Sequence, residues 1–417
     1  MSADTPKTVV TGIGVATPNG LGVDDFWAAT RIGKNAIGRV TRFDPTQYPS
    51  RLAGEIQGFV AEDHLPNRLI PQTDRMTRLA LIAADCAFED AGVRPGDIPE
   101  FDMGVVTAST SGGFEFGQNE LKKLWSQGSQ YVSAYQSFAW FYAVNSGQIS
   151  IRNGMRGPSG VVVSDQAGGL DAIAQARRQI RKGSKLIFSG GFDASICPWG
   201  WVAQLANGRM STSDDPDRAY VPFDAEASGY VPGEGGALLI LEDADAARSR
   251  GAQNIYGEIS GYASTFDPKP DRVRPGSESG VGREPGLRRA IELALADAGL
   301  APDQIDVVFA DAAGTPELDR VEAEAISAVF GPGRVPVTAP KTMTGRLYSG
   351  AAPVDVVSAV LSMREGLIPP TTNVTLSPEY DIDLVTTQPR TASVRAALVL
   401  ARGYGGFNSA VVVRAVD

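Results

Sequence analysis

The residues best placed for catalysis lie in one stretch, 161–182, where a β-branched run is followed by a turn and a helical pattern. The run ends at Asp165, Gln166 lies at the corner, and three small residues, 167–169, lead into an alanine-rich helix. A strand–turn–helix of this kind pushes one side chain into a cleft and places backbone N–H groups beside it. An enzyme built this way usually has Ser or Cys at the corner. Glutamine cannot act as a nucleophile, so Gln166 excludes the usual covalent chemistry there.

Few other residues can supply nucleophilic or acid–base chemistry. The single histidine, His64, lies in a polar loop that we expect at the surface, so we expect neither histidine catalysis nor a histidine metal site. The two cysteines, Cys86 and Cys197, form no CxxC pair, and we expect both to be small buried residues. Gly12 and Gly14 match a dinucleotide-binding loop only in part, because its third glycine is missing. We therefore expect no cofactor and no metal.

The composition is that of an acidic globular protein. Of its 417 residues, 43% are hydrophobic and 21% are charged, and 38 basic against 48 acidic side chains give a formal net charge of −10. This length predicts two or three domains. No basic stripe is present, so we expect no binding to nucleic acid or to a membrane. We see no secretory signal and no run of about 18 apolar residues, and we expect a cytoplasmic protein.

Periodicity predicts several of the elements that must position the corner. Apolar residues recur every three or four positions over 74–91, which predicts a helix capped by Thr73 or Asp74. Residues 103–107 are predicted to form a buried strand. Residues 114–125 are predicted to form an amphipathic helix or a lid.

An unusually aromatic segment occupies residues 133–151, and its aromatic residues are Tyr135, Phe138, Trp140, Phe141 and Tyr142. The segment fits a core helix, and it also fits a helix at a subunit interface, where aromatic side chains are enriched. Farther along the chain, 207–232 and 264–284 are predicted to be loops.

An internal repeat indicates a duplicated fold. Residues 89–98 (EDAGVRPGDI) resemble residues 296–305 (ADAGLAPDQI), and each copy closes a helix and leads into an apolar strand. Two copies of one unit predict an α/β fold with two similar halves, 1–254 and 255–417. Alternating strands and helices favour largely parallel sheets that are covered on both faces.

With these elements placed, the chain resembles the β-ketoacyl synthases of the thiolase-like superfamily over nearly its whole length. The matching residues are DRMTR at 74–78, PFD at 222–224, GEG at 233–235 and GYGGFN at 403–408. The resemblance implies a thiolase-like duplicated fold. In that fold two mirrored β/α halves are stacked in a five-layer αβαβα arrangement.

The same resemblance shows which catalytic residues are missing. Active members use a cysteine nucleophile, two histidines and a lysine. Here Gln166 takes the place of the cysteine, Ala313 replaces the histidine of a His-Gly-Thr motif, and Arg346 replaces the histidine that ends Lys-x-x-x-Gly-His. Only Lys341 is retained. An amide forms no acyl enzyme, alanine donates no proton and arginine stays protonated, so we expect no Claisen condensation here.

Two of these residues have open interpretations. Lys341 serves either chemistry or simply packing and an ion pair. Arg346 either fills the space of the lost histidine and pairs with a carboxylate, for which Asp355 is the candidate, or has no such partner.

One subfamily resembles this chain in detail, the chain length factors, which are the β subunits of ketosynthases in type II aromatic polyketide synthases. The matches are QAGGLD at 166–171, SAYQSFAWFY at 133–142 and GRLY at 345–348. The resemblance implies a heterodimer with a catalytic ketosynthase α subunit and a growing polyketide held in a tunnel at the shared interface. It also implies that acyl carrier protein docks mainly on the α subunit and that this chain helps to set product length.

The two gate positions of that subfamily map to Phe114 and Leu121, which follow Gly112 and Gly113. Seven residues are two helical turns, so both side chains would share one face of a helix. The alternative is that both are ordinary apolar packing residues. Because Leu is smaller than Phe, we expect a deep tunnel and a product longer than an octaketide, a decaketide or beyond.

Two other functions compete with this interpretation. The Gln166 amide, beside backbone N–H groups, could stabilise an enolate-like oxygen and so decarboxylate malonyl carrier protein to prime the chain. The third hypothesis is an active condensing or thiolytic enzyme that uses Cys86 or Cys197, although neither cysteine lies at the corner.

Overall fold

The structure is a computed structural model that describes residues 6–267 and 285–416. The predicted loop 264–284 lies mostly outside these residues. Its first described residues continue a strand as far as Phe266 instead of forming a loop.

One twelve-stranded sheet runs through the molecule. Its N-terminal half consists, in spatial order, of β6 (Ser159–Val162), β5 (Met103–Ala108), β7 (Leu186–Asp193), β8 (Gly235–Asp243) and β1 (Thr8–Thr17), with β2 (Gly20–Leu21) paired to β1. The C-terminal half continues with β9 (Gly257–Phe266), β16 (Phe407–Arg414), β15 (Ala396–Gly403), β10 (Val307–Phe309), β11 (Pro336–Thr338) and β13 (Asp383–Leu384). The two half-sheets are joined by two residue pairs of β1 and β9, Val9 with Glu258 and Val10 with Gly257.

The sheet is mixed, so the prediction of largely parallel sheets was wrong. Strands β1, β8 and β7 pair antiparallel, and so do β9, β16 and β15. The parallel pairs lie toward the two edges. Residues 404–406 alone connect β15 to β16, and so short a connection permits only an antiparallel pair.

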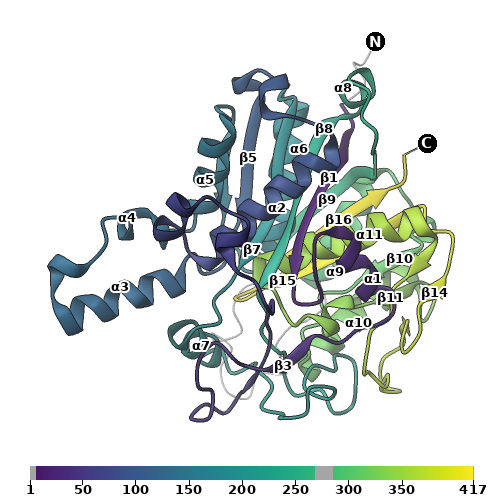
Figure 1. Cartoon of the computed structure of the whole chain (residues 1–417). Coiled ribbons are helices and arrows are strands. Elements are labelled where there is room, and N and C mark those ends of the chain that lie inside the picture. The colour runs from purple at the N-terminus through teal and green to yellow at the C-terminus, as the bar shows by residue number, and fades with distance from the viewer. Residues whose placement is uncertain (1–5, 268–284, 417) are drawn as a thin grey trace.

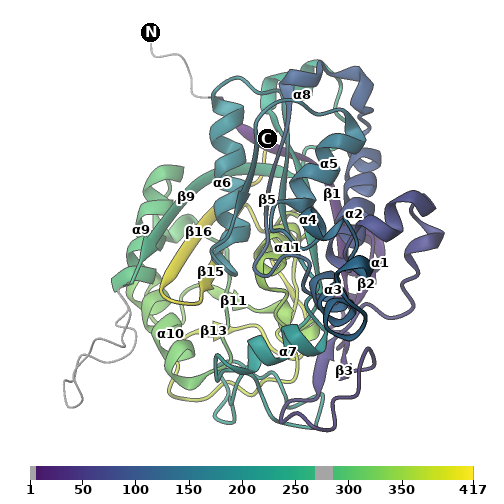
Figure 2. The same ribbon diagram turned by 90° about the vertical axis from the view of Figure 1, so that its left-hand side faces the viewer.

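Helices form three layers around the two half-sheets. On the outside, α2 (Arg75–Ala91) packs on β1 and β8, and α9 (Pro285–Ala298) packs on β9 and β16. Between the half-sheets, α6 (Ala167–Arg181) and α11 (Ala351–Glu365) contact each other and strands of both halves. Figure 2 shows α9 and α10 (Pro316–Phe330) on one side of the molecule and α2 and α5 (Val144–Asn153) on the other. The α/β fold is therefore the layered αβαβα arrangement that the resemblance implied.

Glycines let the outer helices lie directly on the strands in both halves. A Cβ atom on Gly12 would lie 2.4 Å from the Ala87 carbonyl oxygen of α2, and one on Gly261 would lie 2.2 Å from the Ala294 carbonyl oxygen of α9. Gly14 is packed on α2 in the same way. The glycines that partly matched a dinucleotide-binding loop thus serve helix–strand packing.

The helix predicted at 74–91 is confirmed with its caps. The Asp74 side chain accepts a hydrogen bond from the backbone N–H of Met76, and Gly92 ends the helix in the left-handed conformation at φ 62°. Other elements are α1 (Val23–Thr30), α7 (Pro198–Leu205), α8 (Ala244–Ser249) and the two-stranded pairs β3 (Ile37–Arg39) with β4 (Leu52–Gly54) and β12 (Leu367–Ile368) with β14 (Arg390–Thr391).

An arm formed by α3 (Phe114–Gln127) and α4 (Gln136–Ala139) projects from the body (Figure 1). The aromatic segment 133–151 forms α4 and most of α5 with a break between them, and Tyr135, Trp140 and Phe141 are 38%, 39% and 48% exposed. The core-helix interpretation was therefore wrong for these three side chains, which flank α4 and are exposed. Among the described residues, no helix is both long enough and apolar enough to cross a membrane.

Candidate functional site

The corner forms as predicted, although the strand is shorter than expected. Strand β6 ends at Val162, Asp165 turns the chain with a φ of 54°, and Gln166 is the residue before the first turn of α6. The Asp165 carboxylate accepts a hydrogen bond from the backbone N–H of Tyr404 at 2.8 Å, which ties the corner to the β15–β16 turn. Gln166 is 2% exposed, and its Oε1 has no hydrogen-bond partner among the described residues.

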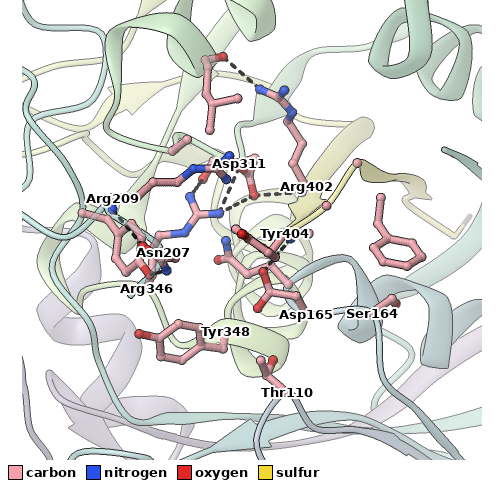
Figure 3. A pocket seen from close by; sticks show the side chains of 18 of the residues that line it. Thr110, Ser164, Asp165, Asn207, Arg209, Asp311, Arg346, Tyr348, Arg402 and Tyr404 are labelled. Atoms are coloured by element: carbon pink, nitrogen blue, oxygen red, sulfur yellow. Dashed lines mark hydrogen bonds and ion pairs between the residues drawn. The ribbon is translucent and has the colours of Figure 1, made fainter. Parts of the chain in front are cut away.

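Gln166 borders a cavity of about 520 Å³ that also contains the other substituted positions. Ala313 and Arg346 line it together with Thr110, Tyr230, Tyr348 and the turn at 403–407. Figure 3 shows this cavity, with the Arg346 side chain directed at Asp311. The structure thus brings together three of the four family positions, Gln166, Ala313 and Arg346, and leaves Lys341 out of the lining.

Arg346 has a buried carboxylate partner, but that partner is Asp311 and not Asp355. Its Nη2 atom lies 3.2 Å from Oδ1 and 3.1 Å from Oδ2 of Asp311, and Nη1 donates to the Asp311 and Ala312 carbonyl oxygens. Burial opposes the charge of Arg346, but the Asp311 carboxylate and its neighbours raise the pKa of the guanidinium above its ordinary value. Arg346 is therefore a permanent cation and cannot accept a proton as the missing histidine could.

Asp355 is instead the partner of Lys341. The Lys341 Nζ lies 2.7 Å from Asp355 Oδ2, with both side chains almost completely buried, and it also donates to the Ala310 carbonyl oxygen. The expectation that Arg346 pairs with Asp355 was wrong because Asp311, two residues before Ala313, lies closer to the guanidinium. The ion pair between Lys341 and Asp355 supports the interpretation that Lys341 serves packing and charge balance.

Buried carboxylates hold the loop that carries Ala313. Glu322 on α10 accepts hydrogen bonds from the backbone N–H groups of Asp311 and Ala312, and Asp319 accepts one from Gly314 at 2.9 Å. Ala312 adopts a positive φ of 51° within this loop. The loop therefore retains a fixed shape, although the only side chain that it presents at the histidine position is a methyl group.

Neither cysteine nor His64 lies at this cavity. Cys197 is buried at the start of α7, and burial raises its thiol pKa to about 11, while burial also raises the pKa of Cys86. Both thiols are thus poor nucleophiles near neutral pH. Cys86 is only partly buried, which differs from the expectation. His64 is exposed and stacks on Phe59, and no group of three potential metal ligands occurs among the described residues.

The two predicted gate residues lie on one continuous helix. Helix α3 begins at Phe114 and extends past Leu121, so the two-turn spacing holds. The Phe114 ring stacks on Trp199 of α7, with centroids 4.7 Å apart and ring planes within 8° of parallel. Leu121 is 38% exposed. A Cβ atom on Gly117, between them, would lie 3.1 Å from the Trp199 ring.

Sequence reasoning missed Trp199 and Asp311. Trp199 follows Cys197 and Pro198 in a helix with no visible link to 114–121, and only the fold brings the two segments together. Asp311 lies two residues before Ala313 in the sequence, but its distance to Arg346 depends on how two loops from different strands meet. A search for carboxylates near each substituted position would have raised Asp311 as a candidate.

Comparison with protein families finds two matches that together cover most of the chain. The N-terminal domain of β-ketoacyl synthases matches residues 6–247, and their C-terminal domain matches residues 256–375. The actinorhodin polyketide putative β-ketoacyl synthase 2 of Streptomyces coelicolor is 60% identical over 98% of both chains. The tetracenomycin polyketide synthase ketoacyl synthase β subunit of Streptomyces glaucescens is 58% identical over 99% of both chains.

Solved structures give the same picture. The ishigamide ketosynthase/chain length factor superposes with a TM-score of 0.89 at 26% identity, covering 99% of this chain and 100% of that one. A type II polyketide synthase acyl carrier protein in complex with its ketosynthase, bound to the hexaketide, contains a chain that superposes with a TM-score of 0.86 at 27% identity, covering 99% and 100%.

Proposed function

The chain belongs to the β-ketoacyl synthase family, as a ketosynthase β subunit of the type II polyketide kind, and from this premise we propose how it works. It is the non-condensing chain length factor of a heterodimer with a ketosynthase α subunit, and it acts in aromatic polyketide biosynthesis. The α subunit supplies the nucleophile and provides the main docking surface for acyl carrier protein. This chain contributes a wall of the interface tunnel, in which Phe114 and Leu121 limit the length of the product.

The observation that carries this proposal is the cavity at the old nucleophile corner. Its frame is intact, with a strand–turn–helix, fixed loops and buried carboxylates, yet Gln166, Ala313 and Arg346 occupy the three reacting positions. Arg346 is bound to Asp311 and remains protonated, so it cannot accept a proton. The backbone of the site is retained while the side chains for condensation are absent, and this supports a role in assembly and in shaping the tunnel.

Co-expression with its ketosynthase α subunit tests this function. Native mass spectrometry should find a 1:1 complex, and the complex with acyl carrier protein and malonyl donor should release polyketides of one main length. The chain alone should release none. A stable homodimer that condenses malonyl units without an α subunit would refute the proposal.

The gate has its own test within the same complex. We propose that Leu121 leaves the tunnel deep, so that the product is longer than an octaketide. Leu121→Phe or Leu121→Trp should shorten the main product, read as its mass, because a larger side chain fills the end of the tunnel. Leu121→Ile keeps the volume and serves as the control. An unchanged product mass in all three variants would show that Leu121 does not limit length.

A second function, priming by decarboxylation of malonyl carrier protein, is favoured by one observation. Gln166 Oε1 is buried at the cavity and lacks a partner among the described residues, so this acceptor oxygen is available to a donor on a group that enters the cavity. Gln166→Ala in the heterodimer would then lower output, and acetyl groups supplied on the carrier protein would restore it. Undiminished output from Gln166→Ala would exclude this role.

Two coarser features complete the proposal. We propose that the chain divides into the halves 1–254 and 255–417, a division supported by the two residue pairs that alone join β1 to β9. We also propose a cytoplasmic location, for which the two free cysteines are consistent with a reducing compartment. Fluorescence microscopy of a tagged chain would test the location.

A further inference from the structure

A single buried carboxylate caps two helices, one of which is the gate helix α3. Asp74 Oδ1 accepts a hydrogen bond from Met76 N at 2.9 Å in the first turn of α2, and Oδ2 accepts one from Phe116 N at 2.8 Å in the first turn of α3. Helix α3 has no side-chain cap of its own, because the residue before it is Gly113. Asp74 is 2% exposed, so it makes both hydrogen bonds away from bulk water.

A chain of ion pairs ties the same turn of α3 to the body a second time. Glu115 Oε1 and Oε2 lie 2.6 and 2.5 Å from Arg42 Nη2. Arg42 Nη1 lies 3.4 Å from Glu234, which is fully buried and in turn binds Arg75, the first residue of α2, at 2.7 Å. Negative and positive side chains therefore alternate along this series of ion pairs, from Glu115 to Arg75, and this alternation favours one arrangement of the four side chains.

Contacts on both sides of Phe114 in the sequence hold this residue in place. On one side of it, a Cβ atom on Gly113 would lie 2.9 Å from Asp74 Cβ and 2.3 Å from the Ala139 carbonyl oxygen, so the backbone has no room to move inward. On the other side, Glu115 and the Phe116 N–H hold the helix. Beyond this turn the helix extends into the projecting arm (Figure 1), so small rotations at its start would displace Leu121.

We propose that Asp74 and Glu115 are positioning residues of the chain-length gate, which fix the first turn of α3 and thereby the places of Phe114 and Leu121 along the tunnel wall. The inference rests on the proposed function. Neither carboxylate is assigned to touch the polyketide. Each acts through the backbone and the axis of α3.

The test replaces each carboxylate by its amide in the reconstituted heterodimer. Asp74→Asn retains one acceptor oxygen and so can cap only one of the two helices, and Glu115→Gln removes the charge that binds Arg42. Glu115 is partly exposed, so Glu115→Gln should fold even if Asp74→Asn does not. The matched control is Asp90→Asn at the other end of α2, where Asp90 also accepts a backbone hydrogen bond, from Ile13 N at 2.8 Å.

Two readouts separate positioning from a general loss of structure. In hydrogen–deuterium exchange, Asp74→Asn should speed exchange in the peptide covering 113–121 by about tenfold. This is the effect expected from losing one hydrogen bond to a charged acceptor. In product analysis, both variants should spread the product over several chain lengths, while the total amount of malonyl donor consumed stays close to that of the unaltered complex. Asp90→Asn should leave the product distribution and exchange in 113–121 unchanged.

The result that overturns the inference differs from the one that overturns the proposed function. If Leu121→Phe shifts product mass but Asp74→Asn and Glu115→Gln keep a single sharp product, the carboxylates do not position the gate. Unchanged exchange in 113–121 would overturn the inference as well. If Leu121→Phe also leaves the product unchanged, the assignment of Leu121 to the gate is wrong, and the inference about Asp74 and Glu115 is then wrong as well.

Discussion

At the scale of single residues, the cavity beside Gln166 is lined by an arginine, Arg346, that is paired with a buried carboxylate. Arg346 supplies four hydrogen bonds to Asp311 and Ala312, and the pair neutralises a buried carboxylate. Such a pair contributes little when compared with an apolar core, but it costs a great deal when one member is removed.

The first prediction concerns this pair. Arg346→Met should lower the free energy of unfolding by about 3–5 kcal/mol, because it leaves Asp311 charged and buried without a counterion. Urea unfolding of the isolated chain measures the change. Arg320→Met is the matched control, since Arg320 pairs with Glu324 one helical turn away at 51% exposure and should cost less than about 1 kcal/mol.

Adding Asp311→Asn to Arg346→Met should recover part of the lost stability, since the uncompensated charge is then removed. A loss of less than about 1 kcal/mol for Arg346→Met alone would mean that water or another group solvates Asp311.

The second prediction concerns pH. Burial raises the pKa of Asp319 to about 7 and those of Asp74 and Asp355 to about 6, against about 3.9 for an unfolded aspartate. The folded chain therefore holds more protons than the unfolded chain between these values. The stability from these groups is fully present below about pH 4 and is lost as the pH rises through 6 and 7.

Urea unfolding at several pH values between 5 and 8 should thus show stability falling by on the order of a few kcal/mol. Asp319→Asn should flatten this slope, whatever it does to stability at pH 5. A stability that rises from pH 5 to pH 8 would contradict the prediction.

Motifs in the sequence located positions that lie together in the structure, but they could not predict contacts that depend on the fold. Gln166, Ala313 and Arg346 were located by counting within motifs, and all three line one cavity. The partner of Arg346 could not be found in that way, because Asp311 and Asp355 are both plausible until the loops after β10 and β11 are placed.

At the scale of elements, periodicity predicted the helices but not which face of each is covered. Helices 74–91 and 114–125 were found close to their observed bounds, because their apolar spacing is regular. For the segment 133–151, the sequence did not decide between a core helix and an interface helix, because aromatic side chains suit both equally. The antiparallel centre of the sheet was missed, because strand direction depends on the lengths of the connections.

The third prediction concerns the packing of α6, the helix that begins at the corner. A Cβ atom on Gly169 would lie 2.4 Å from both Pro353 Cδ and the Ser349 carbonyl oxygen, so α6 meets the start of α11 at backbone distance. Gly169→Ala should therefore destabilise the chain by about 1–3 kcal/mol. Gly147, inside α5, has no atom within 4 Å of its Cβ position, and Gly147→Ala should stabilise by up to about 1 kcal/mol.

Thermal or urea unfolding of the two variants decides the matter, since the substitution is chemically identical at both sites. Equal effects at Gly169 and Gly147 would show that helix propensity alone determines the outcome and that α6 and α11 are not packed as described.

At the scale of the whole molecule, duplication and exposed surface account for two different properties. The repeat at 89–98 and 296–305 predicted two similar halves, and the equivalent helices α2 and α9 lie on their strands through glycines in the same way. The arm lies in the half 1–254 but outside the repeated segments 89–98 and 296–305, and the exposure of its aromatic side chains could not be predicted from the sequence. Large apolar side chains gathered on one projection indicate an interaction surface.

The fourth prediction assigns that surface to the ketosynthase α subunit. Trp125, on α3, is 84% exposed and Phe141, after α4, is 48% exposed. Trp125→Glu and Phe141→Glu should leave the stability of the isolated chain almost unchanged, because they remove little buried area. Each should weaken the complex at least tenfold, the effect expected when an aromatic anchor of an interface is lost.

Ile32→Glu is the control for this experiment, because Ile32 is 68% exposed but follows α1, on the other side of the molecule from the arm (Figure 1). Titration of each variant with labelled α subunit gives Kd. An unaltered Kd for both arm variants would place the partner on another face, and the aromatic side chains of the arm would then need a different explanation. A weaker complex for Ile32→Glu as well would indicate that charge, and not the arm, controls assembly.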